Sequence, residues 1–213
     1  MTTLINRLII ASLSASSLLF LPIGSCTREY ESCSYISQYS IIDHIQIENY
    51  VVNNSDSSLL FSFRFNTDGH VSVASKGSDK QLYNKICNIN GDTSHCGTVE
   101  KSGAYFSGGG AFYPNVSAIN ITCNIDFDAN HPAGTLLNDC FEIEYNHYEQ
   151  FNDDGFVQKR KKLSEIEKIN CLAQSNCDIF YIAPPTSKQY ATITLTITMD
   201  NGKVFEAKCN RMI

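Results

Sequence analysis

Histidines with acidic neighbours are the first residues to consider for catalysis or metal binding. The chain has five histidines, scattered along its length: His44, His70, His95, His131 and His147. Asp43 precedes His44, and Glu144 lies three positions before His147. Residues three apart on a strand point to opposite faces, so Glu144 and His147 could not bind one ion together there. We therefore predict surface histidines, no catalytic residue, no metal ligand and no other cofactor.

An acidic run that begins at Asp126 is a second candidate. Asp126, Asp128 and Asn130 reproduce the first half of a calcium-binding loop. Such a loop needs glycine at its sixth place and an acidic residue at its twelfth, where this chain has His131 and Leu137. We interpret the run as acidic residues at the end of a strand, with a looser calcium site as the alternative. The chain also lacks Gly-x-Ser-x-Gly, His-Glu-x-x-His and a phosphate-binding loop.

Cysteines offer metal binding or disulfide chemistry. The chain has nine cysteines, and no two of them form a Cys-x-x-Cys pair. A cytosolic zinc protein would need such pairs, with histidines nearby. An exported chain with an odd number of cysteines would leave one thiol unpaired. One cysteine therefore calls for a separate explanation.

The N-terminal segment supplies that explanation. Residues 8–23 form an apolar run after a short, positively charged start, and residues 21–26 read LPIGSC. This motif resembles the lipobox of bacterial lipoprotein signal peptides. The resemblance implies that residues 1–25 are removed and that Cys26 carries a diacylglyceryl group with fatty acids such as palmitate. The alternatives are an ordinary secretory leader and an uncleaved anchor, for which the apolar run is short.

The other eight cysteines could close four disulfides, which fits an oxidising compartment such as the periplasm or the cell surface. They are Cys33, Cys87, Cys96, Cys123, Cys140, Cys171, Cys177 and Cys209. Two local bridges are favoured. Cys87 and Cys96 flank the turn signal Asn90-Gly91, and Cys171 and Cys177 flank five residues at the end of an expected helix. Cys33, Cys123, Cys140 and Cys209 keep three possible connectivities.

The charge balance argues against a nucleic-acid partner. Lys and Arg number 16 and Asp and Glu 22, which gives a formal net charge of −6. Removing residues 1–25 takes away only Arg7 and leaves 15 against 22, or −7. Nucleic-acid binders are usually basic. The one basic patch is KRKK at 159–162, which we interpret as the solvated start of a helix, with a contact to anionic lipid or an acidic partner as the alternative.

The elements that must position these residues are mostly strands, because apolar residues recur with a period of two. Strands are predicted over 41–49, 59–66, 70–75, 99–106, 111–127, 140–148, 156–159, 179–182, 191–199 and 203–209. Capping boxes at Ser78 and Ser164 predict short helices over 78–87 and 165–174. The predicted fold is mainly β: an antiparallel β-sandwich-like domain with one or two short helices, stabilised by disulfides. Its parts are a signal peptide (1–25), a lipidated tether (26–40) and a single β-rich domain (41–213).

Aromatic residues on both sides of a glycine triplet give a candidate contact loop. Tyr105 and Phe106 precede Gly108 to Gly110, and Phe112 and Tyr113 follow it. Loops of this kind can present rigid rings to a sugar or a protein. The alternative is a structural hairpin whose rings are half buried in the core.

These observations predict an exported, membrane-anchored lipoprotein that acts as a non-catalytic binding or envelope-assembly module. Its partners are the lipid bilayer, through the N-terminal lipid, and an unknown protein or glycan. The expected location is the bacterial envelope, at the outer membrane or cell surface, with secretion as the alternative. The alternative functions are a secreted hydrolase with an unrecognised site and an unlipidated inhibitor or effector.

Overall fold

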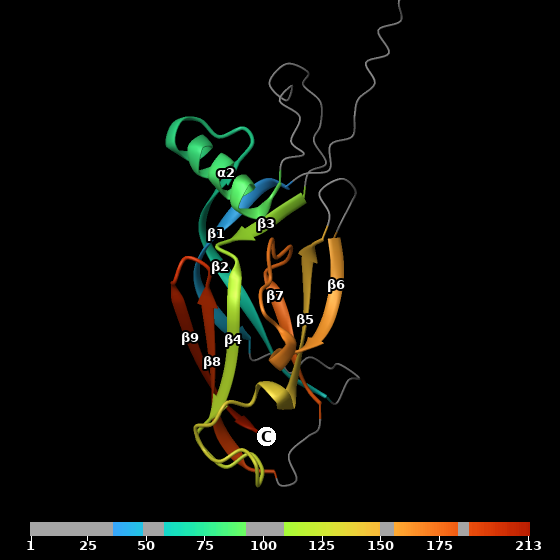
Figure 1. Cartoon of the computed structure of the whole chain (residues 1–213). Coiled ribbons are helices and arrows are strands. Elements are labelled where there is room, and N and C mark those ends of the chain that lie inside the picture. Colours follow the sequence, from blue (N-terminus) through green and yellow to red (C-terminus); the bar gives the residue numbers. More distant parts are fainter. Residues whose placement is uncertain (1–35, 49–57, 93–108, 150–155, 183–187) are drawn as a thin grey trace, which may run out of the picture. The chain divides into compact units, whose positions relative to one another are not determined.

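The computed structural model describes residues 36–48, 58–92, 109–149, 156–182 and 188–213 (Figure 1). The chain divides into two units, Met1–Ser32 and Cys33–Ile213, and every described residue belongs to the second. The expected signal peptide and Cys26 lie outside the described residues. The same holds for Cys33, Cys96, Tyr105 and Phe106.

The second unit is built from strands and one α-helix among its described residues. The strands are β1 (Ile36–Glu48), β2 (Leu59–Ser72), β3 (Gly109–Tyr113), β4 (Val116–Cys123), β5 (Phe141–Tyr148), β6 (Phe156–Lys162), β7 (Asn176–Tyr181), β8 (Tyr190–Met199) and β9 (Val204–Met212). The helix is α2 (Gly77–Asn90), and two 3-10 turns span Asn138–Cys140 and Leu163–Glu165. The prediction of a mainly β fold is confirmed.

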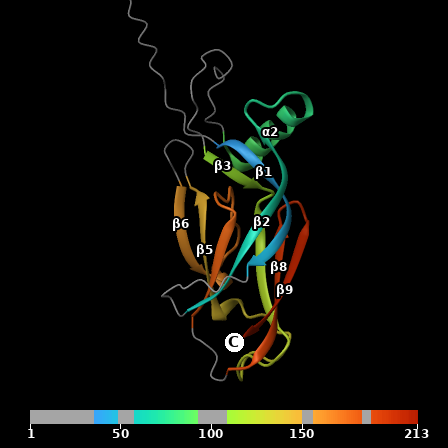
Figure 2. The same cartoon turned by 180° about the vertical axis from the view of Figure 1, so that it is seen from behind.

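The strands form two sheets that share one hydrophobic core. One sheet has the order β3-β1-β2-β7-β5-β6 and the other the order β4-β8-β9 (Figures 1 and 2). Buried side chains of both sheets belong to the same cluster, among them Phe63 of β2, Ile143 of β5 and Leu195 of β8. Their apolar faces therefore pack against each other. The larger sheet is mixed, because β3 runs parallel to β1 while its other pairs are antiparallel.

The hairpin of β8 and β9 follows directly from the sequence. Ile193, Leu195, Ile197 and Met199 are buried, and the threonines between them are only partly so. Gly202 has a φ of +84°, the left-handed conformation that the tight turn after Met199 requires. The strand predicted over 191–199 is thus confirmed as β8, which is the central strand of the smaller sheet.

The strands predicted over 59–66 and 70–75 form one strand, β2, and the segment Thr67-Asp68-Gly69 between them is a β-bulge where a turn was expected. β2 continues through it from Leu59 to Ser72 and stays paired with β1 on both sides. The register moves from Ser40 opposite His70 to Ile42 opposite Thr67, so β2 holds one residue more than β1 there. Gly69, with a φ of +92°, accommodates the bulge. The sequence indicated that Gly69 changes the direction of the chain. Because β2 stays paired with β1, the strand bends there and does not reverse.

The first predicted helix is confirmed with different ends. α2 starts at Gly77, and its N-cap, Lys76, makes no side-chain capping bond, so the capping box expected at Ser78 is not used. Gly91 ends the helix in the left-handed conformation, with its N–H donating to the carbonyl of Asn88. Tyr83, Ile86 and Cys87 are the buried residues of the helix. They belong to a second, smaller cluster with residues of β1.

The second predicted helix, 165–174, does not form. Only the 3-10 turn Leu163–Glu165 is helical there, and the following chain makes β-bridges to two strands. Ile169 exchanges both backbone hydrogen bonds with Val116, at 3.1 and 2.9 Å, and Cys171 accepts one from Tyr148 at 3.1 Å. A helix this short has little stability of its own, so tertiary pairing overrides the capping signal.

The cysteines are not bridged in the described part of the chain. Cys87, Cys123, Cys140, Cys171, Cys177 and Cys209 are all free. The bridge predicted between Cys171 and Cys177 is therefore not formed. Cys177 packs in the main core, whereas Cys171 packs with Cys87 in the cluster under α2. The bridge predicted from Cys87 to Cys96 is not present either, since Cys87 is free; Cys96 itself lies outside the described residues.

The basic patch KRKK lies on a strand. It forms the second half of β6, which is the last strand of the described larger sheet and pairs with β5. Arg160 contacts Glu142 across the pair at 2.7 Å, and its guanidinium lies 3.8 Å from the ring centre of Phe180. The basic residues thus lie along one edge of the described sheet.

One buried amide connects three separate segments. The Asn115 side chain is at the corner between β3 and β4 and is 2% exposed. Its Nδ2 donates to Asn90 at 2.7 Å and to Asp200 at 3.0 Å, and its Oδ1 accepts from the Cys171 N–H at 2.9 Å. The end of α2, the β8–β9 turn and the 166–175 segment therefore meet at Asn115.

Replacing Asn115 by alanine should lower the free energy of unfolding by about 2–3 kcal/mol, because it leaves a buried N–H and other polar groups without partners. Urea denaturation measures the loss. The matched control is Asn88→Ala, at an exposed position of α2, which should change stability by less than about 0.5 kcal/mol. Equal effects of the two substitutions would show that the Asn115 network adds nothing.

Candidate functional site

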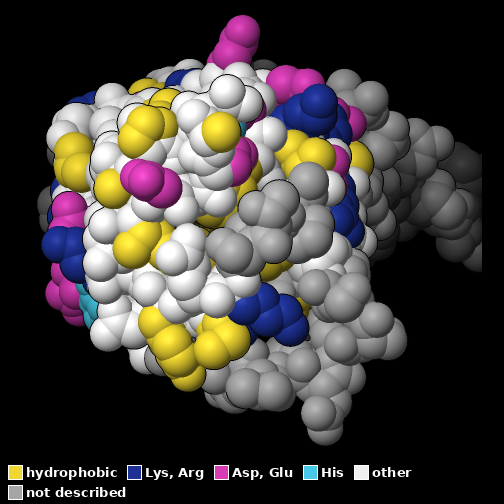
Figure 3. All heavy atoms as spheres, turned by 90° about the horizontal axis from the view of Figure 1, so that it is seen from below, with side chains coloured by type: hydrophobic (Ala, Val, Ile, Leu, Met, Phe, Trp, Pro, Cys, Tyr) yellow, Lys and Arg dark blue, Asp and Glu magenta, His cyan; other side chains and the backbone are white. Residues whose placement is uncertain are grey.

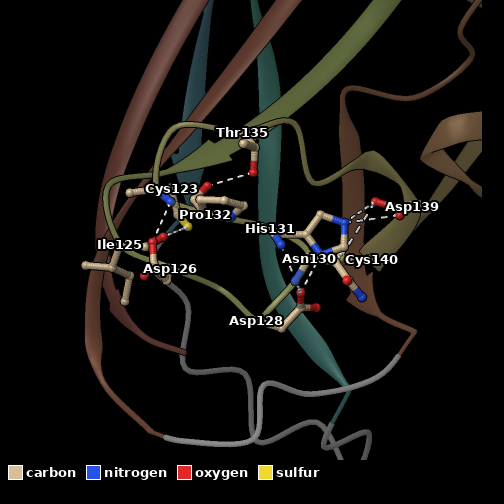
Figure 4. Close-up of polar contacts among 11 residues, drawn as sticks. Cys123, Ile125, Asp126, Asp128, Asn130, His131, Pro132, Thr135, Asp139 and Cys140 are labelled. Carbon is tan, nitrogen blue, oxygen red and sulfur yellow. Dashed lines mark hydrogen bonds and ion pairs between the residues drawn. The ribbon is translucent and has the colours of Figure 1, made fainter.

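The loop between β4 and β5, residues 124–140, brings together a histidine, a cysteine and acidic side chains from different turns (Figure 4). The loop folds back along β4. Gly134 donates to the carbonyl of Cys123 at 2.7 Å, and Leu137 donates to that of Ile121 at 2.9 Å. Asp126 accepts a hydrogen bond from the Ala133 N–H at 2.8 Å. These bonds give the loop a defined path.

Asp128 organises a tight turn within this loop. Its Oδ1 accepts hydrogen bonds from the N–H groups of Asn130 and His131, at 2.7 and 3.0 Å. Phe127 in turn donates its N–H to the carbonyl of His131 at 2.9 Å. The acidic run that resembled half of a calcium loop thus supports backbone turns. One consequence is that the His131 ring is folded back over Asp128.

The ring of His131 lies between two carboxylates. Nδ1 is 2.8 Å from Oδ1 of Asp128, and Nε2 is 3.1 Å from both carboxylate oxygens of Asp139. The side chain of His131 is only 16% exposed, so it is not the surface histidine that was predicted. The hydrogen bond to Asp128 is the main reason that the pKa of His131 is raised, and the same contact lowers the pKa of Asp128. The contacts stabilise the imidazolium form.

Cys140 completes the group from the 3-10 turn that precedes β5. Its Sγ lies 3.8 Å from both ring nitrogens of His131 and 3.7 Å from Oδ1 of Asp139. Burial, followed by the nearby charges of Asp139 and Asp128, raises the pKa of the thiol to about 12. At neutral pH the sulfur therefore keeps its proton.

This pairing of cysteine and histidine does not make a nucleophile. A catalytic cysteine needs a lowered pKa or a free base beside it. Here the thiol pKa is raised, and both nitrogens of His131 face carboxylates. What the arrangement can offer is a set of donor atoms: Asp128, His131 and Cys140 each supply one within 4.8 Å of the others. Such a set could hold a metal ion.

The sequence did not reveal this site, because its members come from two different turns. Cys140 was treated as a disulfide cysteine and Asp139 was not considered. The available signal was Asp128 three residues before His131, the spacing of a turn in which a side-chain oxygen caps the backbone.

The other histidines that the structure describes, His44, His70 and His147, are not part of this group, and His95 lies outside the described residues. His44 contacts its neighbour Asp43 at 3.0 Å and is exposed. Burial, followed by Lys159 and Lys161, lowers the pKa of His147. Glu144 accepts a hydrogen bond from Gln158 at 2.6 Å on the β5–β6 pair. Glu144 and His147 thus serve separate contacts.

The described half of the candidate contact loop belongs to β3. Phe112 packs against the main core, where its ring centre lies 6.4 Å from that of Phe65. Tyr113 packs against the cluster under α2. Both rings are only partly exposed. The contact role of the whole stretch stays a prediction, since Tyr105 and Phe106 are not described.

The face that carries the 124–140 loop shows hydrophobic side chains in small separate groups, with acidic and basic side chains among them (Figure 3). No helix in the described ranges is both long and apolar enough to cross a membrane.

Comparison of the chain with family models, with curated proteins and with solved structures found no match. The residues themselves must therefore carry any functional argument.

The titration of His131 gives a test of the ring's environment. Because its pKa is raised, the imidazolium should persist above the ordinary value of 6.5, and its contribution to loop stability should disappear as the pH rises through the raised value. Asp139→Asn should lower the pKa that is read from the ring's NMR shifts. Asp126→Asn is the control, since Asp126 accepts a hydrogen bond from the Ala133 N–H and has no described contact with the His131 ring. An unchanged titration in Asp139→Asn would contradict the two-carboxylate arrangement.

A second test concerns the rings of β3. Replacing Phe112 and Tyr113 by serine should lower the melting temperature by roughly 5–10 °C, because both rings pack against buried clusters. Tyr190→Ser is the matched control: this ring is 74% exposed, and its loss should have little effect. A double variant as stable as the wild type would return both rings to the list of contact residues.

Proposed function

We propose that this protein is an exported lipoprotein, anchored in a bacterial envelope membrane through Cys26, whose β-rich body binds a protein or glycan partner without catalysis. The observation that carries the proposal is the motif Ile23-Gly24-Ser25-Cys26 at the end of an apolar segment. An aliphatic residue three positions before the cysteine, with two small residues between, is the pattern of the lipobox.

The distance from the lipid to the body supports a module that works close to a membrane. Ile36, the first residue of β1, stands ten positions after Cys26. A fully extended chain of this length spans at most about 35 Å. Residues 36–40, assigned to the tether from the sequence, belong to β1. The body would therefore stay near the bilayer surface.

A binding role is favoured over a catalytic one by what the side chains do. The alternating residues of the strands are used for the core, and in the 124–140 loop the carboxylates cap turns and enclose His131. The alternative functions, a secreted hydrolase or an unlipidated inhibitor or effector, would need a site elsewhere in the chain. The net charge of −6 continues to disfavour nucleic acid as a partner.

The finer description of the body as a disulfide-stabilised β-sandwich is part of this proposal. The shared core of two sheets supports the sandwich. The six described cysteines, Cys87 among them, are free, and Cys33 and Cys96 lie outside the described residues.

The decisive experiment is Cys26→Ser in cells that are fed a labelled fatty acid. The wild type should take up the label and fractionate with membranes, and the variant should lose both properties. Cys33→Ser, the nearest other cysteine, should keep the label. The mass of the purified N-terminus then reports the cleavage site. Label that is retained in Cys26→Ser, or an unmodified Cys26 in the mature chain, would exclude the anchor.

A further inference from the structure

We propose that Asp128, His131 and Cys140 bind a divalent cation of the zinc class, with Asp139 holding the histidine ring in position. The site does not depend on the lipid anchor. It rests on the geometry of the 124–140 loop, on the type of donor atoms and on the way that the loop supports them (Figure 4).

The three donor atoms lie within 4.8 Å of one another, close to the spacing that one small ion needs. Tetrahedral zinc has bonds of about 2.0–2.3 Å, which places its ligand atoms roughly 3.3–3.7 Å apart. Sγ of Cys140 lies 3.8 Å from Nδ1 of His131, and Oδ1 of Asp128 lies 2.8 Å from the same nitrogen. To hold an ion, Asp128 and the ring must separate by less than about 1 Å, and any pair near the 4.8 Å limit must approach by about 1 Å.

The supporting contact has the form found around metal-bound histidines. A histidine that binds a metal through one nitrogen usually donates the other N–H to a carboxylate, which fixes the tautomer and the ring plane. Here Nε2 faces both oxygens of Asp139 at 3.1 Å, so Nδ1 is the nitrogen that is left for the ion. Nδ1 is also the nitrogen on the side of Asp128.

The ligand atoms are held before any ion binds. Two backbone N–H groups fix the Asp128 carboxylate, and the rings of Phe127 and His131 form a T-shaped pair with their centres 6.4 Å apart. Cys140 is fixed at its own backbone, where its N–H donates to Leu137 and its carbonyl accepts from Ile182, both at 2.9 Å. A site held in this way loses little conformational entropy on binding.

The donor set selects the class of metal. Calcium and magnesium prefer oxygen ligands only, so a sulfur and an imidazole among three ligands disfavour them. Nitrogen, sulfur and one carboxylate oxygen suit zinc and similar ions. Three protein ligands leave one position of a tetrahedral ion for water or for a donor atom of a bound partner.

Binding exchanges protons for the ion. Bonds form from the metal to Oδ of Asp128, Nδ1 of His131 and Sγ of Cys140. The S–H bond breaks and its proton goes to solvent, because a thiol that coordinates such an ion is deprotonated. An imidazolium ring also releases its Nδ1 proton. No electron is transferred, so the step needs no oxidant or reductant.

The test uses the full processed chain, kept reduced with a phosphine, and begins with a mass-spectrometric check that Cys140 can be alkylated. Titration with Co²⁺ should then give a sulfur-to-cobalt charge-transfer band and the strong visible bands of tetrahedral cobalt. Zn²⁺ should displace the cobalt with one equivalent, and calorimetry in two buffers should show proton release. A merely structural role of these residues would produce none of these signals.

Variants assign the signals to residues. His131→Gln and Cys140→Ser should each weaken Zn²⁺ binding by more than about 100-fold, and Asp139→Asn by about 10- to 100-fold, the usual effect of losing a supporting carboxylate. Asp128→Asn should weaken binding, whereas its matched control Asp126→Asn and the exposed His44→Gln should not. Cys140→Ser replaces a single atom, so it remains informative if His131→Gln fails to fold.

Three results would overturn the proposal. One is the absence of a charge-transfer band with Co²⁺. Another is Zn²⁺ binding of the same strength in Cys140→Ser, His44→Gln and the wild type, which would indicate adventitious binding. The third is a Cys140 that is found bridged to another cysteine, such as Cys123, in the protein as it is isolated.

Discussion

The buried side chain of Asn115 is the interaction on which the arrangement of the body depends most. Its amide bonds to residues that are 25, 56 and 85 positions away in the sequence, and at 2% exposure water cannot replace any of them cheaply. β4 begins one residue later, at Val116, and ends at Cys123, where the loop with His131 departs. Fixing Asn115 therefore fixes one end of the strand whose other end carries the candidate site.

The fold could be predicted where a single strand packs one of its faces against the core. The alternation in β8 gave both its limits and its buried face, because a period of two is visible in a single segment. Prediction failed where a distant partner decides the outcome. Gly69 is a bulge and not a turn because β1 continues beside it, and residues 166–174 are not helical because Val116 and Tyr148 offer hydrogen bonds. Such partners cannot be read from local sequence.

The candidate site was hidden for a related reason. His131 and Cys140 are nine positions apart, which is no recognised ligand spacing, and only the folding back of the loop along β4 brings them together. The same acidic run that looked like an incomplete calcium loop supplies the turn and one of the ligand atoms. Sequence alone could identify residues that are able to bind a metal, but not the two turns that bring them together.

The basic residues of β6 have a consequence for the behaviour of many copies together. Lipid anchoring, as proposed, confines the protein to a plane and raises the frequency of collisions between neighbours. β6 is the last strand of the described larger sheet, and an edge strand presents backbone groups that can pair with another chain. Lys159, Arg160, Lys161 and Lys162 place four positive charges on that edge. On the proposed membrane anchor, two such edges would repel each other, which would disfavour sheet-to-sheet pairing between neighbouring copies.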